Sequence, residues 1–200
     1  MALLPLLTAC EMATPPDRVE TYDYTARLLN GFPLVFRWPA ASLPVRIWAE
    51  PVLDLPLHVT AAITTWQGGV LYGEVRAVRV EDSTDADVII LLGEPELALR
   101  GDRACTGSTQ LEVDLDTAIV LPFRTRVGAR SGASSDAVQS CLATTTAHEL
   151  GHALGLFLHS SDPDDLMYGR PTADALSPRD VATLQTLYHS APTVRLPPGR

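Results

Sequence analysis

Hydrophobic and polar residues alternate in two segments of the N-terminal half, residues 43–50 and 74–80. This pattern predicts half-buried strands. Residues 88–92 are continuously apolar, which is typical of a central strand buried on both faces. Between the first two strands, apolar residues at helical spacing predict a helix capped by Asp54, with Pro56 in its first turn. The helical stripe comprises Val59, Ala62, Ile63, Trp66 and Val70.

Apolar residues alternate with acidic residues again between residues 110 and 121, and we expect one or two further strands there. The segment 124–135 is rich in glycine, serine and arginine and is interpreted as a loop. The order strand, helix, several strands and then helices predicts an α+β fold. We expect a mixed, mostly parallel, twisted sheet packed against helices, with at least one parallel crossover.

Two helices are predicted in the C-terminal third of the chain. Ser134 or Ser135 caps a long helix that continues to Leu154. Residues 177–180 then supply a serine N-cap, a proline at the first helical position and an acid at the third. The apolar stripe of this last helix consists of Val181, Leu184 and Leu187.

The chain has 200 residues, 46% of them hydrophobic, which is enough for one compact domain with its own core. We expect this domain to span residues 31–190, after a tether at 11–30 and before a tail at 191–200. The net charge is -9, from 15 Lys and Arg against 24 Asp and Glu. A nucleic-acid binder presents a basic patch, and the sequence contains no such cluster, so we expect no nucleic-acid partner.

Residues 1–10 form an apolar run that ends in small residues, as the cleavage region of an export signal does. Leu7 to Cys10 also resemble the lipobox of bacterial lipoproteins, in which the cysteine is acylated. A positively charged segment is missing, so a start farther upstream and an accidental resemblance stay open. We expect an exported protein, extracellular or attached to the cell envelope, with Cys10 as a candidate lipid anchor.

Cys105 and Cys141 form an even pair once Cys10 is set aside. In an oxidising compartment, a disulfide is the default expectation for such a pair. Two buried free thiols are the alternative. A disulfide would attach the long predicted helix to the segment around Cys105.

His148, Glu149 and His152 form an H-E-x-x-H sequence on the long predicted helix. Residues four apart share one helix face, so both imidazoles can reach one ion while Glu149 lies to the side. A catalytic zinc site needs a third protein ligand, and His159 is the downstream candidate. On an unbroken helix His159 would lie about 16 Å along the axis from His148, so Gly155 must end the helix and return the chain.

Residues 148–155, followed by a His-Ser pair, resemble the zinc motif of the metzincins, most closely the matrixin branch. The family pattern has two residues between the glycine and the third histidine, whereas this chain has three. Asp162 is therefore an alternative third ligand, since a carboxylate also binds zinc. The resemblance implies the α+β metzincin fold, with Met167 in a Met-turn beneath the histidines and a C-terminal helix. A core methionine in an ordinary loop is the alternative for Met167.

The resemblance implies a zinc-dependent endopeptidase with one catalytic Zn²⁺, Glu149 as general base and a protein or peptide substrate. We expect a monomer. Two other functions stay open: a degenerate, non-hydrolytic zinc-binding envelope protein, and zinc hydrolysis of a non-peptide amide. Because the ligating imidazoles must be neutral, metal affinity and activity are expected to decline as pH falls through the histidine range.

Overall fold

The structure is a computed structural model that describes residues 19–70, 72–93, 105–114, 118–129 and 134–197. Its strands are β1 (Ala26–Arg27), β2 (Pro33–Leu34), β3 (Val45–Ala49), β4 (Ala77–Arg79), β5 (Val88–Leu92), β6 (Cys105–Gln110) and β7 (Phe123–Ala129). Its helices are α1 (Leu55–Gly68), α2 (Ser135–Ala153) and α3 (Pro178–His189), with short 3₁₀ turns at Ala40–Ser42 and Ser83–Asp85. The predicted export signal and Cys10 lie outside the described residues.

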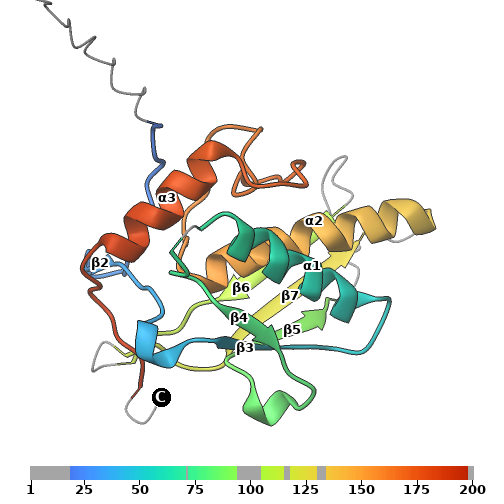
Figure 1. The fold of residues 1–200 in the computed structure, drawn as a ribbon, viewed down its shortest axis with the longest axis horizontal. Helices are drawn as coiled ribbons and strands as arrows, with labels where there is room; N and C mark the ends of the chain where they lie inside the picture. Colours follow the sequence, from blue (N-terminus) through green and yellow to red (C-terminus); the bar gives the residue numbers. More distant parts are fainter. Residues whose placement is uncertain (1–18, 71, 94–104, 115–117, 130–133, 198–200) are drawn as a thin grey trace, which may run out of the picture.

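A five-stranded sheet in the order β4-β3-β5-β7-β6 forms the centre of the fold (Figure 1). The first four strands run parallel, and β6 pairs antiparallel with β7 at one edge. The predicted α+β class and the mixed, mostly parallel sheet are therefore confirmed. Strand β5 is central as expected, although Ile89 and Leu91 on its second face are only partly buried.

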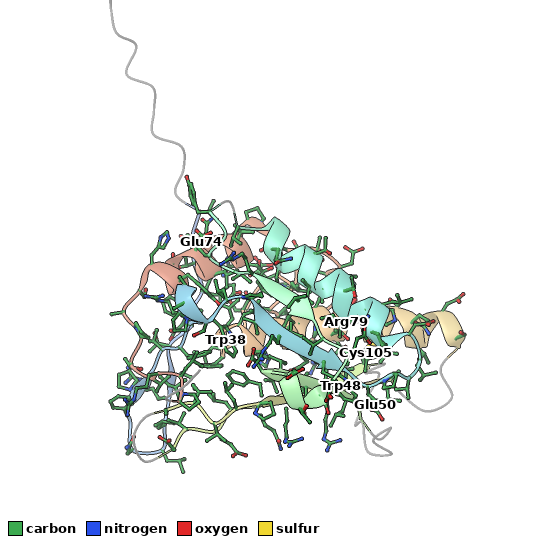
Figure 2. All side chains as sticks on the ribbon, turned by 60° about the horizontal axis from the view of Figure 1, so that its bottom comes forward. Trp38, Trp48, Glu50, Glu74, Arg79 and Cys105 are labelled. Carbon is green, nitrogen blue, oxygen red and sulfur yellow. A yellow bond between two sulfur atoms is a disulfide. The ribbon has the colours of Figure 1, made fainter. Side chains whose placement is uncertain are left out.

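Helices α1 and α2 lie side by side over one face of the sheet (Figure 1). Helix α1 covers β3 and β4, while α2 covers β6 and β7. The two helices are joined inside the core, where the indole N–H of Trp66 donates to the carbonyl of Ala147 at 2.8 Å. Trp38, also in the core, donates its indole N–H to the carbonyl of Ala153 near the end of α2 (Figure 2). Each bond satisfies a buried polar group that would otherwise lose its partner.

The predicted stripe of α1 is buried, but its predicted cap is wrong. Asp54 precedes the helix with φ 57, and its side chain makes no capping hydrogen bond. A cap needs an extended backbone to direct the side-chain oxygen at the first free N–H groups, and a left-handed residue does not provide this. Pro56 lies in the first turn as expected, because the proline ring presets a helical φ.

The strands expected between residues 110 and 121 are displaced in the structure. Strand β6 ends at Gln110, and the described residues of the following segment form only isolated bridges, such as that between Val113 and Ile119. The alternation of apolar and acidic residues there reflects a partly buried connection. Its apolar side chains Leu111, Val113 and Leu121 pack against the core.

The prediction of a loop at residues 124–135 is wrong for residues 124–129, because these belong to β7, Phe123–Ala129. Arg124 and Arg126 are exposed on one face of β7, while Thr125 and Val127 are buried on the other. Alternation of this kind is a strand pattern, and arginine is compatible with it wherever one face of the sheet meets solvent. Pairing with both β5 and β6 holds this segment in the sheet.

Some described residues on both sides of the predicted domain, 31–190, pack against it. Tyr22 is 7% exposed, and its hydroxyl donates to Asp180 Oδ1 in α3 at 2.9 Å. Val194 and Leu196 are buried in the main core. Residues before 31 and after 190 therefore contribute to the packed core. Among the described residues, no helix combines the length and hydropathy of a membrane span.

Candidate metal centre

Helix α2 carries two of the candidate ligands on one face. Ser134 caps the helix, because its side chain accepts from the backbone N–H of Ala137, and the helix runs to Ala153. His148 and His152 lie one turn apart, with ring centroids 4.8 Å apart. Both therefore face the same region beside the sheet.

Gly155 returns the chain directly after α2. Its φ is 114°, a conformation that residues with a side chain rarely adopt, and a Cβ here would overlap the carbonyl oxygen of Phe36. The three residues that follow bring His159 back, with its ring centroid 5.2 Å from that of His148 and 5.0 Å from that of His152. The turn thus accommodates the extra residue that distinguishes this sequence from the usual pattern.

The three imidazoles present their donor atoms to one point. The candidate ligand atoms of His148, His152 and His159 all lie within 4.8 Å of one another. The Nε2 atoms of His152 and His159 are 3.2 Å apart. Zinc held tetrahedrally at about 2.0–2.1 Å from each nitrogen requires pairs roughly 3.3–3.4 Å apart, and the pair of His152 and His159 matches this spacing. Asp162 is not part of this cluster, and its carboxylate pairs with Arg179 at 3.0 Å.

Backbone carbonyls orient two of the rings. His148 Nδ1 donates to the carbonyl of Leu166 at 2.7 Å, and His152 Nδ1 donates to the carbonyl of Leu156 at 2.6 Å. A proton on Nδ1 leaves the lone pair of Nε2 free for a metal. Burial lowers the pKa of His148 to about 4 and that of His152 to about 3. In the metal-free protein, both rings therefore stay neutral, and able to bind a metal, at pH values well below the ordinary pKa of histidine.

The segment beneath the histidines is held by an acid of α3. Met167 is 0% exposed and lies against α2, where a Cβ on Gly151 would overlap its sulfur. Asp180 accepts from the backbone N–H groups of Leu166 at 2.7 Å and Met167 at 3.3 Å. The same carboxylate also completes the capping box of α3 with Ser177. Asp180 was expected only as an acid of the first helical turn, since its contact with the methionine segment is tertiary.

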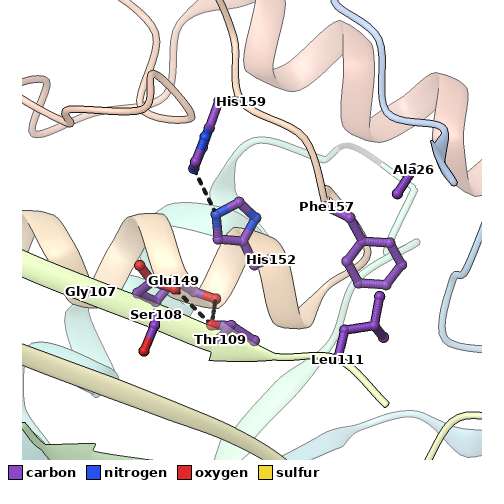
Figure 3. Close-up of a pocket in the computed structure, with 9 residues that line it drawn as sticks. All are labelled: Ala26, Gly107, Ser108, Thr109, Leu111, Glu149, His152, Phe157 and His159. Carbon is purple, nitrogen blue, oxygen red and sulfur yellow. Dashed lines mark hydrogen bonds between the residues drawn. The ribbon is translucent and has the colours of Figure 1, made fainter. Parts of the chain in front are cut away.

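Glu149 lies beside the histidines with its side chain turned toward β6 (Figure 3). It is 3% exposed, and its Oε2 accepts from the hydroxyl of Thr109 at 2.7 Å. Burial raises the pKa of Glu149 to about 7, and the Thr109 hydrogen bond opposes that rise. A carboxylate with a pKa near neutrality can both take and release a proton under physiological conditions.

An open cleft of about 390 Å³ runs past these groups (Figure 3). One part of its wall is polar, formed by the backbone and hydroxyls of β6 together with Glu149 and two histidines. The other part is apolar and is formed by Ala26 of β1, Leu111 and Phe157, which lies in the turn after Gly155. The lining residues are Ala26, Gly107, Ser108, Thr109, Leu111, Glu149, His152, Phe157 and His159.

A family model supplies independent evidence for this site. The matrixin model matches residues 78–189, more than half of the chain. The chain belongs to the matrixin family. The matched range contains β5 to α3 and therefore every histidine of the cluster, whereas β3 and α1 precede it. No curated protein sequence matches the chain.

Family membership and the three-histidine cluster together assign this matrixin to the zinc metallopeptidases. The three imidazole nitrogens lie within 4.8 Å of one another, and nitrogen donors of this kind are ligands that zinc favours. This cluster lies on the face of α2 that carries His148 and His152, and Glu149 lies to its side.

The predicted disulfide between Cys105 and Cys141 is present in this matrixin. It joins β6 to the N-terminal half of α2, and the two cysteines are 36 positions apart in the sequence. The expected partner segment was a loop, but Cys105 begins the edge strand. The bond therefore attaches the wall of the cleft to the helix that carries the histidines.

Acidification should destabilise the metal-free matrixin as pH falls from 6.5 toward 4. Burial lowers the pKa of His148, His152 and His159 below the ordinary 6.5, so the unfolded chain binds more protons in this window. The raised pKa of Glu149 acts in the opposite direction, but one carboxyl does not offset three imidazoles. Thermal unfolding with chelator present should give a lower midpoint at pH 5 than at pH 6.5.

The matched control is Glu149→Gln, which removes the opposing group and should make this pH dependence steeper. An unfolding midpoint that stayed constant or rose between pH 6.5 and pH 5 would contradict the role of the buried neutral imidazoles.

Proposed function

We propose that this matrixin is an endopeptidase that holds one zinc ion with His148, His152 and His159 and uses Glu149 as its general base. The observation that carries the proposal is the convergence of three imidazole donors within 4.8 Å, in a cleft that Glu149 also lines. Three protein nitrogens leave a fourth coordination position open, which is the arrangement of catalytic rather than structural zinc sites.

A bound zinc ion supplies Lewis-acid chemistry, acidifying a water molecule and polarising the scissile carbonyl. Glu149 accepts a proton from the attacking water and transfers it to the departing amine. Its burial supports this role, because burial raises the pKa of the Glu149 carboxyl in the metal-free protein and so favours uptake of a proton. The carbonyls of Leu166 and Leu156 hold His148 and His152 in the required orientation.

The edge strand β6 supports a peptide as substrate. Among the described strands, β6 is the last of the sheet and pairs only with β7. Its residues Gly107, Ser108 and Thr109 line the cleft next to Glu149. An extended peptide can add to such an edge through main-chain hydrogen bonds, which brings one of its peptide bonds past the general base. A non-peptide amide makes no comparable use of the strand.

The rival proposal of a non-hydrolytic zinc-binding protein rested on the extra residue before His159. Because the turn at Gly155 still brings His159 into the cluster, that argument loses its support. The two functions make different predictions for hydrolysis, so one experiment separates them.

The purified protein should bind one zinc ion per chain and cleave casein or a quenched fluorescent peptide. A chelator should reduce cleavage to background, because the proposed mechanism requires the metal, and stoichiometric zinc should restore it. Metal analysis and the peptide assay are carried out on the same samples. Zinc binding without cleavage would favour the non-hydrolytic protein, whereas cleavage that persists in the metal-free sample would refute the zinc mechanism.

We also propose that the protein is exported and monomeric, with Cys10 as a lipid anchor. The disulfide between Cys105 and Cys141 supports export, because such bonds persist mainly in oxidising compartments. Mass spectrometry of the mature N-terminus tests the anchor, which would appear as an acylated Cys10. A mature chain that retained residues 1–9 would contradict it.

A further inference from the structure

The side chain of Thr109 contacts Glu149 across the space between the sheet and α2. Its Oγ1 lies 2.7 Å from Glu149 Oε2 and 3.2 Å from the Glu149 backbone carbonyl (Figure 3). Residues 105, 107 and 109 alternate onto the same face of β6, toward the helix. Thr109 therefore contacts the carboxylate from β6, whereas Glu149, His148 and His152 all belong to α2.

The direction of these hydrogen bonds follows from the single proton of a hydroxyl group. Thr109 Oγ1 has three partners: Glu149 Oε2, the backbone carbonyl of Glu149, and the hydroxyl of Thr125 at 3.0 Å. The shortest contact is to a carboxylate oxygen, which in its ionised form can only accept, so Thr109 donates there. Thr125 then donates to Thr109. The two hydroxyl groups thus donate in series, Thr125 to Thr109 and Thr109 to Glu149 Oε2.

The surrounding structure keeps Thr109 in place. Thr109 and Thr125 are cross-strand partners in β6 and β7, and Thr125 is 0% exposed. The disulfide between Cys105 and Cys141 fixes the start of β6 to α2. Gly107 makes room for the carboxylate, because a Cβ there would overlap Glu149 Oε1. Strand β6 thus packs closely against one side of the Glu149 carboxylate.

We propose that Thr109 is a positioning residue that holds the carboxylate of Glu149 in its catalytic orientation. This inference rests on the proposed function of Glu149 as the base. Within the described part of the chain, Thr109 is the one side-chain donor to this carboxylate. Without it, the carboxylate would turn between several rotamers, and fewer molecules would hold it in line with the attacking water. Removal of the hydroxyl should therefore slow the chemical step and leave substrate binding and zinc binding unchanged.

The test compares Thr109→Val, which keeps the shape and removes the hydroxyl, with Thr109→Ser, which keeps the hydroxyl. Thr109→Val should lower kcat by about tenfold to a hundredfold, the effect expected for one hydrogen bond to a charged group. KM and the zinc content should match the parent, and Thr109→Ser should restore most of kcat. Thr106→Val is the matched control, since it makes the same change on the opposite face of β6.

Three results would overturn the inference: an unchanged kcat in Thr109→Val, a Thr109→Ser variant as slow as Thr109→Val, or a parallel loss of zinc. If Thr109→Val lowers the thermal midpoint, Thr109→Ala repeats the comparison without a second methyl beside the carboxylate. A parent that binds zinc but cleaves no peptide would refute the proposed function itself. An active parent with an equally active Thr109→Val would refute the role of Thr109 alone.

Discussion

Replacing Glu149 with glutamine should lower kcat for peptide cleavage by about 10²- to 10⁴-fold and leave one zinc ion bound. The amide has nearly the shape of the carboxylate and can still accept from Thr109, whose hydroxyl lies 2.7 Å from Oε2. It cannot take a proton from water. The three imidazoles are unchanged, and backbone carbonyls still orient His148 and His152, so metal binding should persist.

Parallel measurements of cleavage rate and zinc content check this result. The matched control is Glu81→Gln, because the side chain of Glu81 is 83% exposed and pairs only with Arg79 among the described residues. Glu81→Gln should cleave at the rate of the parent. A Glu149→Gln variant that contained zinc and retained the parental kcat would refute the assignment of the general base.

Replacing Gly155 with alanine should lower the free energy of unfolding by about 3 kcal/mol and weaken zinc binding. The residue has a φ of 114°, and a Cβ would overlap the carbonyl oxygen of Phe36 and approach Leu187. Relief of this clash requires the chain after α2 to move. His159 follows in that segment, so its Nε2 would leave the position 3.2 Å from Nε2 of His152.

Chemical denaturation and zinc titration measure the two effects of this substitution. Gly68→Ala is the matched control, because Gly68 ends α1 and a Cβ there meets nothing within 4 Å. That substitution should be neutral or slightly stabilising, since alanine favours a helix over glycine. If Gly155→Ala bound zinc as tightly as Gly68→Ala, the turn would not be what brings the third imidazole to the metal.

Features encoded by short stretches of sequence could be predicted without the structure. His148, Glu149 and His152 share a helix, and their spacing alone places them on one face. The caps of α2 and α3 follow from residues adjacent to each helix start, and Ser134 and Ser177 both accept the expected backbone bonds. The return of the chain at Gly155 was also predictable, because a straight helix could not bring His159 to the same ion.

The tertiary structure decided which strands border the site. The segment with the clearest alternation, residues 110–121, forms only isolated bridges in its described part beyond β6, while the arginine-containing segment from Phe123 forms β7. Strand identity depends on pairing with distant partners, and β7 is stabilised by β5 and β6 on its two sides. The position of β6 beside the general base followed from that pairing.

The sequence by itself predicted the candidate donors of the metal site, with Asp162 as an alternative to His159, and the candidate base Glu149, since these lie within one helix and the turn after it. Only the tertiary structure showed how they are supported. Thr109 lies 40 residues from Glu149, and Asp180 lies 14 residues from Leu166, whose backbone N–H it binds. Contacts of this kind form when sheet, helices and disulfide pack together, and no local pattern of residue types records them.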